Sequence, residues 1–377
     1  MRDHSSRGAI LLDPEPSSSS PASIRLDRAR LLDALSSARL NPSTATLRRS
    51  INDLRTGVGR PSGTLRARGL REAAEFTPEF LDEEFDQICG AQTLDRARYY
   101  VDRLIKSITE VRTSAINDIN LNRWKEYEDI QTDSLWLVAN RERGGAHSAK
   151  YWGNFVPQIP HQMMRRYTKA GDWVLDVFAG SGTSLIEGQR LGRNTIGIEL
   201  QPQVARMARK AIASEPNAFD VTSQIVCGDS ATIDAKKLLR AHGQESAQLV
   251  IMHPPYFDII KFSEDERDLS NAPSVEAFLE TIGRVVENVS PLLDRGRYLA
   301  VVIGDKYANG EWVPLGFRTM DAIQQRGFML KSVIVKNFEQ TTAKRQQKEL
   351  WKYRALAGGF YVFKHEYIFV FKKTGRG

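Results

Sequence analysis

A glycine-rich turn is the first segment whose residue types could bind a ligand. Asp176-Val-Phe-Ala-Gly-Ser-Gly-Thr183 follows the apolar stretch 173–175, and a helical pattern begins near Thr183. Glycine lets a backbone approach a ligand without a Cβ clash, and the first turn of a helix offers free N–H groups. The spacing differs from GxGxxG and from a phosphate-binding loop, which needs Gly-Lys-Ser/Thr. A tight turn in any α/β protein is the alternative, so this segment alone is weak evidence.

Two acids end the strands expected after this turn. Glu199 closes Asn194-Thr-Ile-Gly-Ile-Glu199, where its carboxylate can accept hydrogen bonds from both hydroxyls of a ribose. Asp229, in Val226-Cys-Gly-Asp-Ser230, can accept from an adenine amino group. The alternatives are a surface acid at Glu199 and a helix N-cap at Asp229. Because strand ends face the ligand crevice of open α/β sheets, ligand binding is favoured for both.

The third group is His253-Pro-Pro-Tyr256, directly after the apolar run Leu249–Met252. Two prolines fix the backbone and remove two N–H donors, so the turn exposes carbonyl oxygens, a His acceptor and an aromatic face. Such a turn suits a planar group that carries an NH₂. The aromatic face stacks on the plane, and two acceptors take the two amine hydrogens. The alternative for His253 is a turn residue that faces solvent.

Residues 150–372 alternate short apolar runs with helical patterns, which predicts a mostly parallel sheet with helices on both faces. The last strand follows the sixth after a loop without a helix, so we expect an antiparallel edge. The predicted helices are 184–191, 204–214, 275–293 and 317–327. The predicted strands are 173–177, 195–199, 224–227, 249–252, 298–303, 332–336 and 367–372.

Residues 1–70 are rich in Ser, Pro and Arg and contain no aromatic residue. Because little apolar surface is available to offset the entropy of ordering, we expect a flexible tail with at most one short helix, over residues 24–38. The alternative is an Arg-rich arm that contacts phosphates.

Residues 71–149 predict a helical region, which separates the tail from a domain over 150–377. Thr77-Pro78 is typical of a helix start. An apolar stripe at steps of three and four runs from Ala97 to Val111. Packing against the next domain is favoured for this stripe, and a substrate-recognition element is the alternative.

Composition narrows the class of protein. The 377 residues are 41% hydrophobic and 26% charged, an ordinary globular balance. No apolar run approaches the ~18–20 residues of a membrane helix, and residues 1–14 do not resemble a secretory signal. Two cysteines, Cys89 and Cys227, exclude a disulfide framework and a four-thiolate zinc site. We therefore predict no metal site and expect a cytoplasmic protein.

The net charge of +7 is concentrated at the N-terminus. Residues 1–72 contain thirteen Arg and seven acidic residues, which leaves the remainder of the chain close to neutral. A basic protein favours a polyanion as partner, but here the signal lies mainly in the predicted tail.

Together, Asp176–Thr183 and His253–Tyr256 resemble the amino-methyltransferases that act on adenine N6 or cytosine N4 in DNA. The family's glycine motif is typically Asp-Pro-Phe-Ala-Gly-Ser-Gly-Thr, and Val177 replaces its proline here. Its catalytic motif has Asp, Asn or Ser before Pro-Pro-Tyr or Pro-Pro-Phe, so His253 is a departure. Residues 151–168 and 365–372 resemble the segment before the glycine motif and the last strand. The resemblance covers about 150–372.

This resemblance implies a Rossmann-like α/β domain with a seven-stranded, mostly parallel sheet and an antiparallel last strand. It also implies S-adenosylmethionine as cofactor and duplex DNA as partner, with the target base flipped out. The catalytic residues would be His253, Pro254, Pro255 and Tyr256, with the His253 side chain and the Pro254 carbonyl as amine acceptors. The cofactor-binding residues would be Gln158, Pro160, Asp176, Phe178, Ala179, Gly180, Gly182, Thr183, Glu199, Asp229 and Ser230.

His253 predicts a pH dependence. Neutral His offers one lone pair, and protonated His offers none. With an ordinary pKa of about 6.5, activity should fall as the pH drops through that region unless the site shifts the pKa. A neutral acceptor is closer to the Ser variant, associated with cytosine N4, than to the Asp variant, associated with adenine N6.

Recognition of DNA is predicted at basic residues that lie among aromatic ones. Lys261 follows the catalytic turn, and residues 337–364 combine Lys and Arg with Trp351, Tyr353 and Phe360. Such a mixture suits contacts with phosphates and bases, and a solvated hairpin or helix is the alternative. The predicted substrate-binding residues are Lys261, Lys344, Arg345, Lys348 and Lys352.

The sequence therefore predicts a site-specific DNA methyltransferase, with a nuclease or another defence component as a partner encoded elsewhere. An RNA or tRNA methyltransferase on a base amine shares the motifs. A catalytically inactive nucleic-acid-binding subunit is a third reading. The choice between cytosine and adenine, the target sequence and the oligomeric state stay open.

Overall fold

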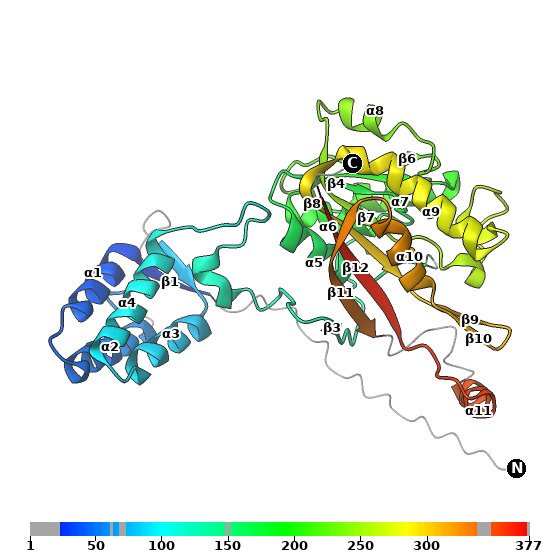
Figure 1. Ribbon diagram of the computed structural model, residues 1–377. Coiled ribbons are helices and arrows are strands. Elements are labelled where there is room, and N and C mark those ends of the chain that lie inside the picture. The colour runs from blue at the N-terminus through cyan, green and yellow to red at the C-terminus, as the bar shows by residue number, and fades with distance from the viewer. Residues whose placement is uncertain are drawn as a thin grey trace, which may run out of the picture. The chain divides into compact units, whose positions relative to one another are not determined.

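The computed structural model describes residues 23–60, 63–67, 73–147, 151, 153–337 and 348–374. The chain divides into two compact units (Figure 1). Unit 1 contains the residues up to Arg112 together with Asn120–Tyr127. Unit 2 contains Thr113–Ile119 and the residues from Glu128 onward.

Unit 1 is a helical unit with one small antiparallel sheet. Strand β1 (Ile24–Asp27) pairs with β2 (Ala73–Phe76). Thr77 caps α3 with a proline at the first helical position, and a reciprocal capping box at Ser43 starts α2. The helices are α1 (Arg28–Arg39), α2 (Thr44–Gly59), α3 (Pro78–Gly90), α4 (Leu94–Thr109) and the 3₁₀ helix η1 (Leu121–Glu126).

The flexible tail expected over residues 1–70 is wrong for residues 24–59. These residues form β1, α1 and α2, and most of their aliphatic side chains are buried in the core of unit 1. The prediction failed because it relied on the lack of aromatic residues, whereas Leu and Ile at helical spacing supply the apolar area instead. Residues 1–22 lie outside the described residues. The core positions are Leu31, Leu35, Leu47, Ile51, Leu54 and Val58.

Unit 2 is built around an eight-stranded sheet in the order β3-β11-β12-β8-β7-β4-β5-β6. All seven predicted strands are present, and β12 runs antiparallel to both of its neighbours, as expected for the last strand. The eighth strand, β3, lies at the edge of the sheet. It has only two residues, which is too short for a periodic pattern to predict it. The strands are β3 (Leu135–Trp136), β4 (Trp173–Asp176), β5 (Asn194–Glu199), β6 (Ser223–Cys227), β7 (Ala247–Met252), β8 (Leu293–Ile303), β11 (Phe328–Asn337) and β12 (His365–Lys373).

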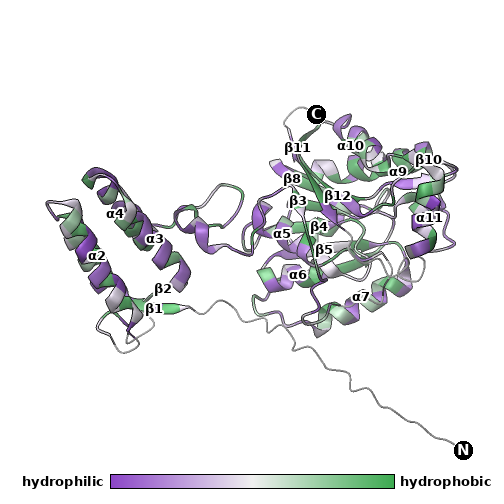
Figure 2. Cartoon of the chain, turned by 90° about the horizontal axis from the view of Figure 1, so that it is seen from below, coloured by the Kyte–Doolittle hydropathy of each residue, from purple (hydrophilic) through white to green (hydrophobic). Residues whose placement is uncertain are grey.

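Both faces of this sheet are buried, which explains why its central strands are nearly continuous apolar runs (Figure 2). On β4, Leu175 belongs to the cluster that contains Phe278 of α9, whereas its neighbour Val174 packs with Met163 of α5. The helices are α5 (Gln158–Tyr167), α6 (Thr183–Leu191), α7 (Pro202–Ser214), α8 (Ala235–Arg240), α9 (Val275–Val289), α10 (Leu315–Gln324) and α11 (Lys348–Gly358). Smaller elements are η2 (Phe257–Ile259), η3 (Leu269–Asn271), η4 (Ser290–Leu292) and the hairpin strands β9 (Lys306–Ala308) and β10 (Glu311–Val313).

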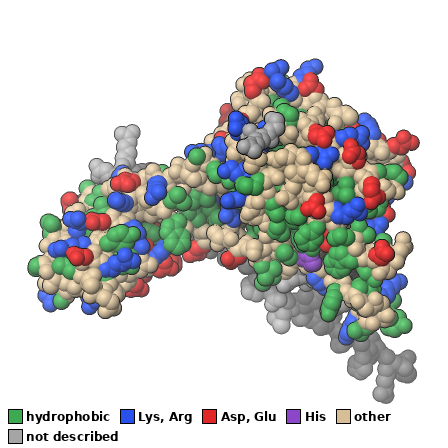
Figure 3. All heavy atoms as spheres, in the orientation of Figure 1, with side chains coloured by type: hydrophobic (Ala, Val, Ile, Leu, Met, Phe, Trp, Pro, Cys, Tyr) green, Lys and Arg blue, Asp and Glu red, His purple; other side chains and the backbone are tan. Residues whose placement is uncertain are grey.

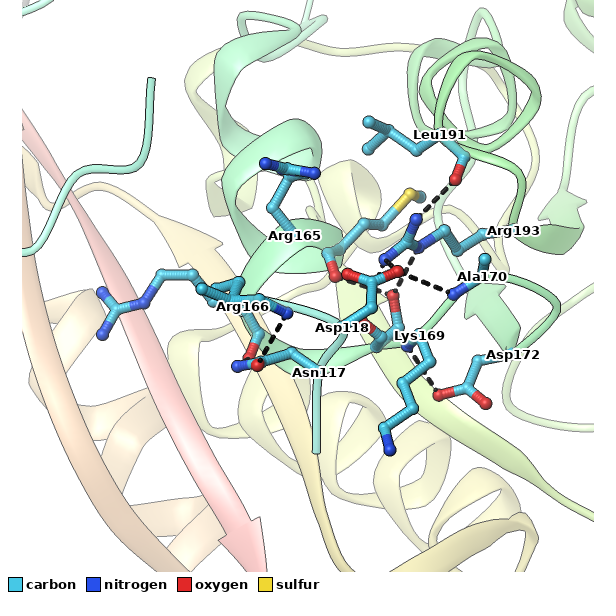
Figure 4. Close-up of polar contacts among 12 residues, drawn as sticks. Asn117, Asp118, Arg165, Arg166, Lys169, Ala170, Asp172, Leu191 and Arg193 are labelled. Carbon is cyan, nitrogen blue, oxygen red and sulfur yellow. Dashed lines mark hydrogen bonds and ion pairs between the residues drawn. The ribbon is translucent and has the colours of Figure 1, made fainter. Parts of the chain in front are cut away.

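Residues 113–119 belong to unit 2 because polar contacts attach them to it (Figure 4). The Asp118 carboxylate pairs with the Arg193 guanidinium at 2.8 Å and accepts from the Ala170 N–H at 3.0 Å. Asn117 donates to the Arg166 carbonyl at 2.8 Å. The Arg193 side chain is buried, so its charge depends on these partners.

Asp118→Ala should lower the free energy of unfolding of unit 2 by about 1–3 kcal/mol, because it leaves the buried Arg193 without its carboxylate. Urea denaturation followed by circular dichroism measures this loss. The exposed Asp133, for which the structure gives no side-chain hydrogen bond, provides the matched Asp133→Ala control. Equal stability of the two variants would contradict the role given to this contact.

Candidate active site

A cavity of about 660 Å³ opens at the carboxyl ends of the parallel strands in unit 2. Parallel strands bring their carboxyl ends to the same edge of a sheet, so the loops after β4, β5, β6 and β7 meet there. The cavity brings together most of the predicted site residues. These are Phe178, Ala179, Gly180, Thr183, Glu199, Asp229, Ser230, His253, Pro254, Pro255 and Tyr256.

The glycine turn has the backbone conformation that its residues allow. Gly180 and Gly182 have φ of +51° and +84°, in the left-handed region that L side chains rarely adopt. A Cβ at Gly180 would lie 3.2 Å from the Tyr151 ring. Asp176 lies beneath the turn, accepts from the Phe178 N–H at 3.1 Å, and has a pKa raised to about 6 by burial. Asp176 and Gly182 therefore shape the turn without lining the cavity.

Glu199 connects the glycine turn to the start of α7. One carboxylate oxygen accepts from the Gly180 N–H and the other from the Gln201 N–H, both at 2.9 Å. Burial raises the pKa of Glu199, and these two backbone bonds oppose that shift. Each oxygen keeps a further lone pair for hydroxyl donors from the cavity.

Asp229 and Ser230 form the next loop. The Asp229 carboxylate accepts from the Ala231 N–H at 2.9 Å, and the Ser230 hydroxyl donates to the Val177 carbonyl. The helix N-cap alternative for Asp229 is wrong, since the N-cap of α8 is Asp234. Asp229 instead stabilises its own turn while lining the cavity.

The His253–Tyr256 turn takes part in a hydrogen-bonded chain that extends beyond the sequence motifs. The Tyr256 hydroxyl lies 3.2 Å from His253 Nε2 and donates to Glu366 Oε2 at 2.7 Å. Glu366 Oε1 pairs with Lys336 Nζ at 3.0 Å. Lys336 and Glu366 face each other across β11 and β12, are buried, and line the cavity. The available signal in the sequence was one charged residue next to the apolar run of each strand, Lys336 after Val333–Val335 and Glu366 before Tyr367–Phe371.

Burial sets the electrostatics of this turn. Desolvation lowers the pKa of His253 to about 4; the Glu366 carboxylate opposes the shift and the Lys336 ammonium adds to it. Burial, followed by the Glu366 charge, raises the pKa of Tyr256 well above its usual value. The site thus shifts the pKa of His253 below the ordinary value of about 6.5, which was the stated condition on the predicted pH dependence, and the shift favours the neutral ring.

Residues 151 and 153–156 border the cavity beside both motifs. The Ser181 hydroxyl donates to Asn154 Oδ1 at 2.7 Å, and the Phe155 ring contacts the His253 ring edge-on at 4.8 Å between centroids. Tyr151, Asn154 and Phe155 line the cavity, but Gln158 and Pro160 do not. Pro160 is buried in α5, and Gln158 donates to the Asn140 carbonyl at 2.7 Å.

Of the predicted DNA-contacting residues, Lys261 and Lys352 do not line the cavity. Lys261 is exposed and pairs with Glu264, between Ile260 and Phe262, which do line the cavity. Lys352 is exposed on α11, and Lys348 is the first residue of that helix. Lys344 and Arg345 lie outside the described residues.

Within the described parts of the chain, no cluster of three or more His, Cys, Asp or Glu side chains is arranged to hold a metal ion. No helix among these residues combines the length and apolarity that a membrane span requires.

Comparison with known proteins gives partial matches to type II methyltransferases. The chain is 34% identical over 99 residues to the type II methyltransferase M2.DpnII of Streptococcus pneumoniae, covering 25% of this chain and 34% of the relative. It is 40% identical over 86 residues to the type II methyltransferase M.MjaII of Methanocaldococcus jannaschii, covering 21% and 16%. The chain thus spans about a third or less of the length of these relatives.

Among solved structures, a methyltransferase from Pyrococcus furiosus aligns over 61% of this chain and 88% of its own, with a TM-score of 0.38 and 13% identity. The family model of the N6/N4 DNA methylases matches residues 78–210 and 247–377. That match includes more than half of the chain and both motifs that meet at the cavity. The chain therefore belongs to the N6/N4 DNA methylase family.

Proposed function

We propose that the protein transfers a methyl group from S-adenosylmethionine to the exocyclic amine of a cytosine or an adenine in DNA. The observation that carries this proposal is the single cavity that joins the Gly180–Glu199 side to the His253–Tyr256 turn. Direct transfer of a methyl group requires that the methyl donor and the acceptor amine lie next to each other. A pocket for the donor that continues into an amine-binding turn would meet this requirement.

The residues on the Gly180 side fit S-adenosylmethionine. A side chain at Gly180 would fill the space beside Tyr151, so the missing Cβ leaves room for a ligand. The Glu199 lone pairs would hold the ribose hydroxyls, and Asp229 would accept from the adenine amine. The remaining contacts would come from Phe178, Ala179, Thr183 and Ser230. The bound cofactor supplies a methyl group activated by its sulfonium.

The residues of the His253 turn suit a flipped base. The base amine would donate to the His253 side chain and the Pro254 carbonyl, which stabilises the positive charge that develops on nitrogen. The Tyr256 ring would stack on the base. Gly304 leaves room for that ring, because a Cβ there would lie 2.9 Å from Tyr256 Cε2. Since His253 is an uncharged acceptor, cytosine N4 is favoured over adenine N6.

Contacts with the DNA backbone would come from Lys261, Lys344, Arg345, Lys348 and Lys352. Figure 3 shows basic and acidic side chains interspersed on the face it draws. We therefore attribute DNA binding to contacts of individual basic residues and not to a large surface of uniform positive charge. Near α11, the Tyr307 and Phe360 rings stack at 4.2 Å, and Trp312 meets Phe363 at 4.1 Å. These two contacts attach the β9–β10 hairpin to residues 360–363.

The named relatives are type II methyltransferases. We propose that this chain acts beside a nuclease or another defence component.

The function is tested by transfer of labelled methyl from S-adenosylmethionine to unmethylated duplex DNA, single-stranded DNA and bulk tRNA, with mass spectrometry of the nucleosides. We expect N4-methylcytosine or N6-methyladenine from DNA. Label found only in tRNA would identify an RNA enzyme. Cofactor binding without transfer to any substrate would favour a non-catalytic subunit.

Glu199→Gln should weaken S-adenosylmethionine binding about tenfold to a hundredfold, because it removes a charged acceptor, worth about 1.5–3 kcal/mol. Isothermal calorimetry measures the Kd. The matched control is Glu311→Gln at an exposed position of β10. An unchanged Kd in Glu199→Gln would exclude this residue from the cofactor site.

Methyl transfer by the native protein should show no inflection attributable to His253 between about pH 5 and 8. Its folded pKa of about 4 keeps the acceptor lone pair free until the pH falls through that value. His253→Asn, whose amide oxygen does not titrate, is the control for other groups. A fall in rate centred near pH 6.5 in the native protein and missing from the variant would contradict this account.

A further inference from the structure

The hydrogen-bonded chain behind the catalytic turn determines which ring nitrogen of His253 carries the proton. The chain runs from His253 Nε2 through the Tyr256 hydroxyl to Glu366, and from Glu366 to Lys336. His253 belongs to the turn after β7, whereas Glu366 and Lys336 belong to β12 and β11. Sequence motifs therefore do not reveal the chain.

The direction of each hydrogen bond follows from the groups that make it. An ammonium group only donates, and an ionised carboxylate only accepts. The Tyr256 hydroxyl has a single proton and donates it to Glu366 at 2.7 Å. At 3.2 Å from His253 Nε2, the hydroxyl oxygen can then only accept. Nε2 must therefore carry the proton of the neutral ring, which leaves the lone pair on Nδ1.

We propose that Glu366 and Lys336 are positioning residues that fix the Nε2–H tautomer of His253, so that Nδ1 presents its lone pair to the substrate amine. The part of this inference that assigns the lone pair to the substrate amine rests on the proposed function. The other tautomer would direct an N–H group at the amine, where two donors would meet.

The burial of the pair fits this role. The Lys336 and Glu366 side chains are 4% and 5% exposed, and their residues are directly opposite in the β11–β12 ladder. A buried ion pair is weak evidence for stability, because apolar residues of similar volume often serve as well. The pair instead keeps the Glu366 carboxylate ionised, and an ionised carboxylate can accept a hydrogen bond from the Tyr256 hydroxyl but cannot donate one to it.

The decisive variant is the double substitution Lys336→Met and Glu366→Leu. It removes both charges together, which avoids leaving one of them buried alone. The Tyr256 hydroxyl then has no carboxylate acceptor and should donate to His253 Nε2, which moves the ring proton to Nδ1. The matched control is Tyr367→Phe, which removes a neighbouring buried hydroxyl that donates to Asp305 at 3.2 Å and is not part of the chain.

The tautomer is read by long-range ¹H–¹⁵N correlation NMR on protein with ¹⁵N-labelled histidine, with the His253 signals identified by their loss in His253→Asn. We expect Nε2–H in the native protein and in Tyr367→Phe, and Nδ1–H in the double variant. The kcat for methyl transfer should fall about tenfold to a hundredfold in the double variant, with unchanged cofactor Kd.

The two readouts separate the possible failures. Nε2–H in the double variant, or Nδ1–H in the native protein, would overturn the inference even if the native protein methylates DNA. A tautomer change without loss of kcat would overturn the catalytic use of Nδ1. A tautomer change in a protein that methylates no DNA would refute the proposed function while leaving the structural role of the pair supported.

Discussion

Polar groups at the carboxyl edge of the unit 2 sheet are shielded from water, so each needs a partner supplied by the protein. Asp176, Glu199, Lys336 and Glu366 are all less than a tenth exposed. Backbone N–H groups satisfy the first two, and the last two satisfy each other. The requirement for partners determines the shape of the glycine turn, the connection from β5 to α7 and the position of the Tyr256 hydroxyl.

The same burial determines the chemistry available at His253. In water the ring would gain a proton near neutral pH and lose its lone pair, but desolvation keeps it neutral. A neutral ring still has two tautomers, and only a fixed hydrogen-bond partner selects one. The geometry of β11 and β12 thus supports a residue on the loop after β7, so the site depends on strands remote from its motifs in sequence.

Features that are local in sequence could be predicted. The glycine turn, Glu199, Asp229 and the His253–Tyr256 turn each follow a recognisable strand, and the seven predicted strands are present. The Lys336–Glu366 pair could not be found in this way, because it depends on the register of two strands joined by a long connection. Likewise, residues 24–59 fold through aliphatic packing with α3 and α4, which the local composition did not indicate.

We propose that this cavity places a base amine against the His253 side chain and the Pro254 carbonyl. The most direct measurement is a crystal structure of the protein with a non-reactive S-adenosylmethionine analogue and a duplex oligonucleotide that contains its methylation site. We expect a flipped base on Tyr256, with its amine within hydrogen-bond distance of His253 Nδ1 and of the Pro254 oxygen. A base amine bound away from both acceptors, or a His253 ring that faces the base with Nε2, would contradict it.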